Sequence, residues 1–160
     1  EATQAIKARK SGKTQRNDSM SHLMDRVSDS FARQGMMQHL GASVARVEPG
    51  LVEIVLPYSD KVTQQQGGFH GGAIGAVADI AAGYAGLTVA PEGMEVVTVE
   101  YKINFLASFQ GGELRAVGRV VKGGKRVIVT TAEVLHVDAG GKTTTCALMQ
   151  QTLAPVPKTY

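Results

Sequence analysis

Cysteine is almost absent from this chain, and its absence excludes two kinds of site. The 160 residues include only Cys146, so a disulfide framework and a cysteine-based metal centre are both excluded within one chain. Cys146 lies in a strand-like run, and we interpret it as a small core residue. The four histidines are dispersed and no HExxH sequence is present, so we expect no metal site.

Several catalytic and binding signatures are missing as well. The Gly-rich stretch at 67–72 lacks the Lys-Ser/Thr ending of a P-loop and the GxGxxG spacing of a dinucleotide-binding loop. No GxSxG sequence provides the nucleophilic serine of an esterase. We find no signal peptide and no transmembrane span, which favours a cytoplasmic protein without a membrane partner.

Most of the chain carries no net charge. Five basic and two acidic residues lie at positions 1–19, and this excess equals the net charge of the whole chain, +3. The remainder is balanced, so we expect no nucleic-acid partner. Residues 1–19 are predicted to be a disordered basic extension or a vector-derived leader, followed by one domain at 20–156.

What the chain does contain is a long apolar stretch with one carboxylate inside it. A polar, Gly-rich segment that starts at Gln64 leads into small apolar residues at 73–90, with Asp79 among them. A helix this apolar cannot face water, so the rest of the fold must wrap around it. A buried carboxylate is costly unless something uses or satisfies it, so this stretch is the first candidate for a functional site.

Three other interpretations of the same stretch stay open. It could cross a membrane, although a carboxylate near the centre costs about 2.5–3.5 kcal/mol and Ala and Gly offset little of that. It could bind an anion, or stabilise an oxyanion, at a helix N-terminus. It could also be a structural core helix in which Asp79 is simply hydrogen-bonded.

The first half of the chain predicts two helices and two strands. Apolar residues at helical spacing predict a helix over about 21–38. Two strands at 42–57 are joined by Pro49-Gly50, which is a strong turn signal. The central helix follows and is ended by Pro91.

The second half predicts four strands separated by short, Gly-rich turns. Apolar and polar residues alternate cleanly over 97–105, and further strands are predicted at 113–122, 126–137 and 142–154. We expect these four strands to form an antiparallel meander. The complete order, α-β-β-α-β-β-β-β, predicts an α+β fold in which a six-stranded antiparallel sheet curls around one long central helix.

On these residues the chain resembles the hotdog-fold acyl-CoA thioesterases, in particular their phenylacetate-degradation-type branch. The resemblance covers about residues 22–154 in element order. Its most specific part is the HGG-x6-D pattern that runs from His70 to Asp79. A second part is the strand at 97–106, which is similar to the third strand of that branch.

The resemblance implies roles for five catalytic candidates. Asp79 would be the nucleophile or general base, and the backbone N–H of Gly71 would be the oxyanion donor. Gln64 would hold the thioester or the attacking water; many family members have Asn there, which leaves the subfamily open. Thr98 would assist Asp79, although its place on a polar strand face is also that of a solvated residue. His70 would mainly shape the loop.

Coenzyme A is implied as part of the substrate, and no separate cofactor is expected. Lys125 and Arg126 follow a glycine turn and are candidates for contacts to the phosphates of coenzyme A. Two adjacent cations at a turn are also ordinary solvated surface. The other candidate substrate-binding residues are Gly72, Asn104 and Gly124.

Helix geometry argues for a site shared between two chains. The leaving thiol of a thioester has a pKa like that of a free cysteine, about 8.5, so one carboxylate and an oxyanion donor can suffice. Gly71 and Asp79 would lie about 12 Å apart along a helix. Attack needs about 3–3.5 Å, so we expect a homodimer with shared active sites. The resemblance implies the same, often as a dimer of dimers, that is, a homotetramer.

The predicted activity is hydrolysis of a small aromatic or short-to-medium-chain acyl-CoA. Two alternatives on the same fold stay open. One is a non-catalytic protein that binds or senses acyl-CoA, and the other is a hotdog dehydratase or hydratase.

Overall fold

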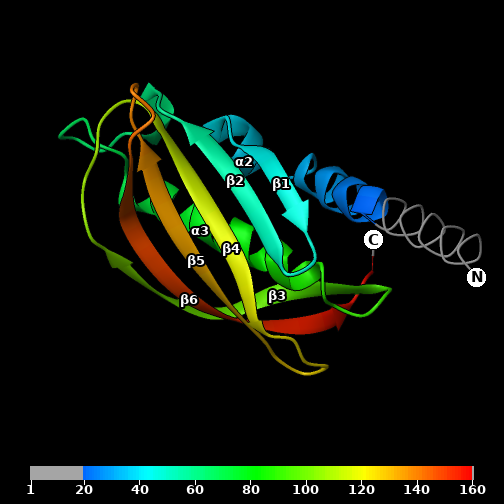
Figure 1. Ribbon diagram of the computed structural model, residues 1–160. Coiled ribbons are helices and arrows are strands. Elements are labelled where there is room, and N and C mark those ends of the chain that lie inside the picture. The colour runs from blue at the N-terminus through cyan, green and yellow to red at the C-terminus, as the bar shows by residue number, and fades with distance from the viewer. Residues whose placement is uncertain (1–19, 160) are drawn as a thin grey trace, which may run out of the picture.

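The computed structural model describes residues 20–159 as a sheet wrapped around one long helix (Figure 1). The predicted fold, a six-stranded antiparallel sheet with a central helix, is confirmed. No helix within these residues is long and apolar enough to cross a membrane. The predicted extension at 1–19 lies outside the described residues.

In chain order the elements are a helix over 20–31, α2 (Gly35–Leu40), β1 (Ser43–Glu48), β2 (Leu51–Pro57), the 3-10 helix η1 (Asp60–Val62), α3 (Gly71–Leu87), β3 (Met94–Phe105), β4 (Glu113–Lys122), β5 (Ile128–Val137) and β6 (Thr143–Pro157).

The central helix, α3, is buried over most of its surface, as its run of small apolar residues predicts. Its N-cap is His70, whose Nδ1 accepts a hydrogen bond from the Gly72 N–H at 2.8 Å. Small residues allow the sheet to approach closely, because a Cβ added at Gly118 in β4 would lie only 2.2 Å from the Ala81 carbonyl oxygen. The helix therefore rests almost directly on the backbone of the sheet.

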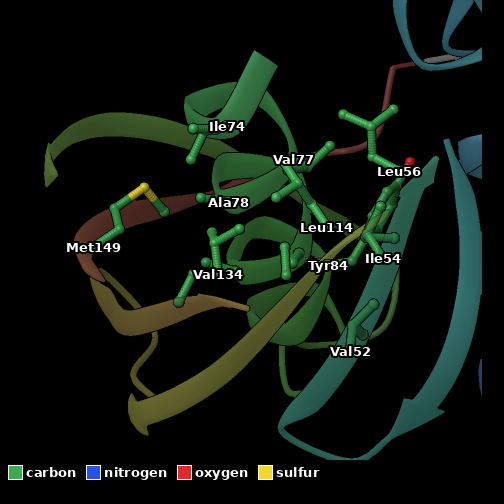
Figure 2. Close-up of a cluster of buried hydrophobic side chains, with 14 of the residues drawn as sticks. Val52, Ile54, Leu56, Ile74, Val77, Ala78, Tyr84, Leu114, Val134 and Met149 are labelled. Carbon is green, nitrogen blue, oxygen red and sulfur yellow. The ribbon is translucent and has the colours of Figure 1, made fainter. Parts of the chain in front are cut away.

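Apolar side chains from the helix and the sheet interlock around α3, as Figure 2 shows. Burying one Val, Leu, Ile or Met side chain stabilises a fold by about 1.5–3 kcal/mol, so this cluster fixes the position of α3 strongly. The labelled members are Ile74, Val77, Ala78 and Tyr84 on α3, Val52, Ile54 and Leu56 on β2, Leu114 on β4, Val134 on β5 and Met149 on β6.

The order of the strands differs from the predicted meander. The sheet order is β1-β2-β4-β5-β6-β3, so of the four strands in the predicted meander only β4, β5 and β6 are successive neighbours. β3 pairs with β6, and the connection at 106–112 leads from one edge of the sheet to β4 in its interior. The prediction was wrong because an alternating pattern identifies a strand and its buried face but not its neighbour. β6 is 15 residues long and can pair along all of β3.

The single helix predicted over 21–38 is two helices. The first occupies 20–31 among the described residues, and α2 follows after a break at 32–34. Gln34 has an extended backbone at this break, and its side-chain amide donates to the Tyr84 hydroxyl at 2.9 Å. The break thus directs a polar side chain from the N-terminal segment onto α3.

A bulge interrupts the alternation that was predicted over 97–105. The register of β3 against β6 shifts between Thr98 and Glu100, which leaves Val99 as an extra residue. A bulge re-aims the side chains beside it, and here Thr98 faces α3 together with Tyr101. Unbroken alternation would have put these two residues on opposite faces of the strand.

Candidate active site

Asp79 lies on the side of α3 that faces β3. Its Oδ1 accepts a hydrogen bond from the Thr98 hydroxyl at 2.7 Å. The carboxylate borders a cavity of about 160 Å³ between α3, β3 and the N-terminal segment. From the sequence, Thr98 could either contact Asp79 or simply be solvated. The structure shows the contact, which the bulge in β3 makes possible.

Two further residues support this carboxylate, Gln151 directly and Thr130 through Gln151, and sequence analysis missed both. The Gln151 side-chain amide donates to Oδ1 of Asp79 and to the Thr98 hydroxyl oxygen, the latter at 3.0 Å. The Thr130 hydroxyl donates to Oε1 of Gln151 at 3.1 Å. The sequence holds one signal for them: Thr130 and Gln151 are polar residues at positions where the alternation of their strands predicts a buried side chain. Gln151 is 72 positions from Asp79, so nothing local connects the two.

The wall of the Asp79 cavity is partly polar. The Gln34 amide donates to the Tyr84 hydroxyl at 2.9 Å, and that hydroxyl donates to the Ser30 hydroxyl at 3.1 Å. The Glu95 carboxylate also lines the cavity and lies 3.5 Å from the Lys158 ammonium group. The remaining lining residues are Ile80, Gly83, Leu87, Val96 and Leu153, and they are mainly apolar.

The N-terminus of α3 presents a second group of candidates. Within residues 20–159 nothing accepts a hydrogen bond from the Gly71 N–H, whereas the Gly72 N–H is taken by His70. Free N–H groups at the start of a helix carry partial positive charge and stabilise anions. The structure therefore leaves Gly71 available as an oxyanion donor and occupies Gly72. His70 acts here as a helix cap, with its side chain otherwise exposed.

Gln64 lines the same cavity as Gly71, with a volume of about 370 Å³. Its backbone closes a tight turn, because the Gly67 N–H donates to the Gln64 carbonyl at 2.9 Å and the Gln64 N–H donates to the Gly68 carbonyl at 2.9 Å. The Gln66 N–H donates to Oε1 of the Gln64 side chain. Within the described chain no acceptor takes its Nε2 protons, so this amide can donate to a group in the cavity.

Aromatic rings support this loop from inside the fold. Phe69 packs edge-on against Tyr58, with ring centroids 5.2 Å apart. His136 stacks on Phe109 at 4.3 Å, and its Nε2 lies 2.9 Å from the Gly111 carbonyl oxygen. These contacts hold the loop that carries Gln64 against the end of the sheet.

The Gly71 group and the Asp79 group do not meet within one chain. They line separate cavities that share no residue. Gly71 and Asp79 are about 12 Å apart along the helix axis, several times the distance at which a carboxylate could attack a polarised carbonyl. Along β3, the Phe105 ring covers Gly71 at one end and Thr98 contacts Asp79 towards the other. The two groups therefore lie too far apart to act on one bond within a single chain.

β3 has the features of a strand that pairs with another chain. It is an edge strand of the sheet, so one side of its backbone has no partner strand within the described residues. Four large apolar side chains along it are exposed: Val97 at 47%, Val99 at 63%, Tyr101 at 45% and Phe105 at 54%. An edge with exposed apolar residues is a ready template for pairing.

The other predicted substrate-binding residues lie outside both cavities. Asn104 lines a hollow on the outer face of the sheet, beside Lys102. Gly124, Lys125 and Arg126 lie in the exposed turn between β4 and β5, near the end of α3. Within one chain the structure does not bring these residues to the cavity of Asp79 or to that of Gly71.

Known proteins resemble this chain in sequence and in structure. The family model described as the thioesterase superfamily matches residues 66–141. A proposed esterase from Saccharolobus solfataricus is 37% identical over 107 residues, which cover 67% of this chain and 74% of that protein. The proofreading thioesterase EntH of Klebsiella pneumoniae is 30% identical over 113 residues, 71% of this chain and 82% of that protein. A crystal structure of a thioesterase family protein from Silicibacter pomeroyi has a TM-score of 0.81 and 38% identity, covering 85% of this chain and 99% of that chain.

Proposed function

The chain belongs to the thioesterase superfamily, and we propose that it hydrolyses acyl-CoA thioesters with small acyl groups at a site shared by two copies. The observation that carries this proposal is the state of Asp79. Its Oδ1 is held by two donors, and Oδ2 has no donor among residues 20–159. A carboxylate fixed at one oxygen and open at the other, beside a cavity, is arranged to act on a substrate.

In this proposal the two halves of the site divide the chemistry. The Gly71 N–H binds the thioester oxygen as negative charge develops on it, a contribution of about 3–4 kcal/mol for one well-placed donor. Gln64 holds the thioester or the attacking water through its amide. Asp79 either attacks the carbonyl carbon or takes a proton from the water that attacks. The thiol leaves as thiolate, because a pKa of about 8.5 makes it a good leaving group.

The second copy enters through β3. Antiparallel pairing of two β3 edges, centred near Tyr101 and Lys102, would place Thr98 of one copy near Phe105 of the other. Asp79 of one copy would then approach Gly71 of the other, because Thr98 and Phe105 mark the two halves of the site. The same pairing would cover exposed apolar side chains of both strands. A dimer of dimers and a cytoplasmic location stay predictions, and so does membership of the phenylacetate-degradation-type branch.

The size of the Asp79 cavity supports a small acyl group. Its volume is about 160 Å³, and an apolar cavity of about 150 Å³ is enough to hold benzene. A single aromatic ring or a short chain fits this space. A long fatty acyl chain does not fit unless the second copy extends the cavity.

Thiol release from a panel of acyl-CoAs tests the proposal. The panel contains small aromatic, short, medium and long acyl groups, with calorimetric titration of a non-hydrolysable analogue alongside. We expect turnover of the small esters by the parent. Asp79→Asn should lower kcat by about 100- to 10,000-fold, the range that positioned acid–base groups contribute, while the analogue still binds.

Asp25→Asn is the matched control, because Asp25 is an exposed aspartate on the N-terminal helix. Full activity of this control, with loss in Asp79→Asn, assigns the effect to the site. Tight binding of acyl-CoA without turnover in the parent would favour the non-catalytic alternative. Turnover by Asp79→Asn within a few-fold of the parent would remove Asp79 from the mechanism.

A further inference from the structure

A polar network connects Asp79 to the interior of the sheet. Its members come from four elements: Asp79 from α3, Thr98 from β3, Thr130 from β5 and Gln151 from β6. Gln151 is 1% exposed and Thr130 is fully buried, while the carboxylate lies at the edge of the cavity. The network therefore reaches from the core of the fold to the proposed reacting group.

Every polar atom of the Gln151 amide has a partner in this network. Its Nε2 donates to Oδ1 of Asp79 and to the Thr98 hydroxyl oxygen at 3.0 Å. Its Oε1 accepts from the Thr130 hydroxyl at 3.1 Å. An unpaired buried amide group would cost about 1–3 kcal/mol, so this complete pairing favours one arrangement strongly.

The direction of these hydrogen bonds matters for Asp79. An amide can be turned by 180° with little change of shape, and its orientation follows from its partners. Turning Gln151 would bring Oε1 against Oδ1 of Asp79, and two acceptors would then face each other. The carboxylate can only accept, so it opposes that turn, and the Thr130 hydroxyl pairs with Oε1 at the other end of the amide.

We propose that Gln151, paired at its far end with Thr130, is a positioning residue that aims the Asp79 carboxylate at the thioester. Gln151 and the Thr98 hydroxyl anchor Oδ1, so the free oxygen Oδ2 has one direction in the cavity. Neither Gln151 nor Thr130 lines the cavity, so both act through Asp79 rather than on substrate. The proposal rests on the proposed function for its effect on turnover, but the contact between Gln151 and Asp79 can be tested without substrate.

Other ionisable groups near Asp79 do not replace these donors. From β3, the Glu95 carboxylate lines the same cavity and is paired with Lys158 at 3.5 Å. From α3 itself, the Tyr84 phenol lines the cavity and is hydrogen-bonded to Ser30. No basic side chain lines the cavity among the described residues, so neutral donors supply the support that a cation would otherwise give.

The main variant is Gln151→Leu, which keeps the approximate volume and removes the side-chain hydrogen bonds of Gln151. We expect kcat to fall about 10- to 100-fold with little change in KM, because Oδ1 of Asp79 loses one of the two donors that aim the carboxylate. The matched control is Gln150→Leu, because Gln150 is the neighbouring glutamine and lies exposed on the outer face of the sheet.

Thr130 supplies a second test that does not depend on how well Gln151→Leu folds. Thr130→Val has nearly the same shape but no hydroxyl, and it should lower kcat in the same direction by a smaller factor. Thr130→Ser restores the hydroxyl and should recover most of the activity. If Thr130→Val folds and keeps full kcat, Thr130 does not support the Gln151 amide and the proposal is overturned.

The substrate-free test follows the side-chain amide resonances of Gln151 in ¹⁵N-labelled protein. Asp79→Asn should shift these resonances, because the charged acceptor of the amide protons is lost, whereas Asp25→Asn should leave them in place. Unmoved resonances in Asp79→Asn would overturn the proposal even in an active enzyme. A shift in a protein that hydrolyses no thioester would support the contact and reject only the proposed function.

Discussion

Two inactive variants should restore activity when they form mixed dimers. The first is Asp79→Asn, which removes the attacking or proton-accepting oxygen and leaves the Gly71 side intact. The second is Gly71→Val. A Cβ added at this position would lie 3.4 Å from the Phe105 ring, and the two methyl groups of valine would displace that ring. In a shared-site dimer, one site of each mixed dimer carries both changes and the other carries neither.

The size of the recovery follows from counting chains. A twofold dimer has two equivalent sites, so with a fraction x of one variant the share of intact sites is x(1 − x). This share reaches about a quarter at equal amounts and falls to zero when either variant is alone. Specific activity should therefore follow a parabola as the mixing ratio changes, a shape that residual activity of either variant cannot produce.

The assay unfolds the two variants together in denaturant, refolds them and measures thiol release at several mixing ratios. Distinct affinity tags on the two chains confirm that mixed dimers form. If Gly71→Val does not refold, Gln64→Ala replaces it, because Gln64 lines the same cavity as Gly71. Mixed dimers that form and stay inactive at every ratio would refute the shared site, and each chain would then have to use its own Asp79.

Three further predictions concern the surface and the core. Changing Lys125 and Arg126 to alanine together should raise KM for CoA esters more than it lowers kcat, since contacts to a remote part of the substrate act equally on ground and transition states; equal losses on short thioesters without CoA would contradict a phosphate contact. Gly118→Ala should lower the free energy of unfolding by about 1–3 kcal/mol or more in urea, because its Cβ would lie 2.2 Å from the Ala81 carbonyl oxygen, and an unchanged midpoint would show that the helix can move away. Burial raises the pKa of the Cys146 thiol to about 11, so at pH 8 the folded protein should resist alkylation while the denatured protein reacts, and rapid labelling of folded protein would contradict that burial.

The sequence was sufficient to predict the class of fold. An apolar helix needs cover on most sides, and six strands with short turns can provide it. It was not sufficient to place β3 beside β6, because pairing is decided by contacts between distant segments. The helix break at 32–34 was also missed, because no proline marks it and apolar residues resume at Met36 soon after Phe31.

The candidate site also has residues that the sequence indicated and contacts that it did not. Gln64, Gly71 and Asp79 lie within one stretch, and their residue types and spacing are enough to mark them as candidates. The contact between Thr98 and Asp79 depends on the bulge at Val99, and an alternating pattern does not reveal a bulge. Gln151 was missed because a buried glutamine on a strand has no distinguishing motif. The roles of all these residues stay predictions until variants are measured.

The wall of the Asp79 cavity has a consequence for how this enzyme could diversify. Ser30 and Gln34, which line it, come from the N-terminal segment, outside residues 66–141 that carry the family match. The loop and helix that carry the proposed oxyanion donor and carboxylate lie almost entirely inside the match. Substitutions in the N-terminal segment could therefore reshape the proposed acyl chamber while the proposed reacting groups stay in place. Selection for a new substrate and conservation of the chemistry would then act on separate parts of the gene.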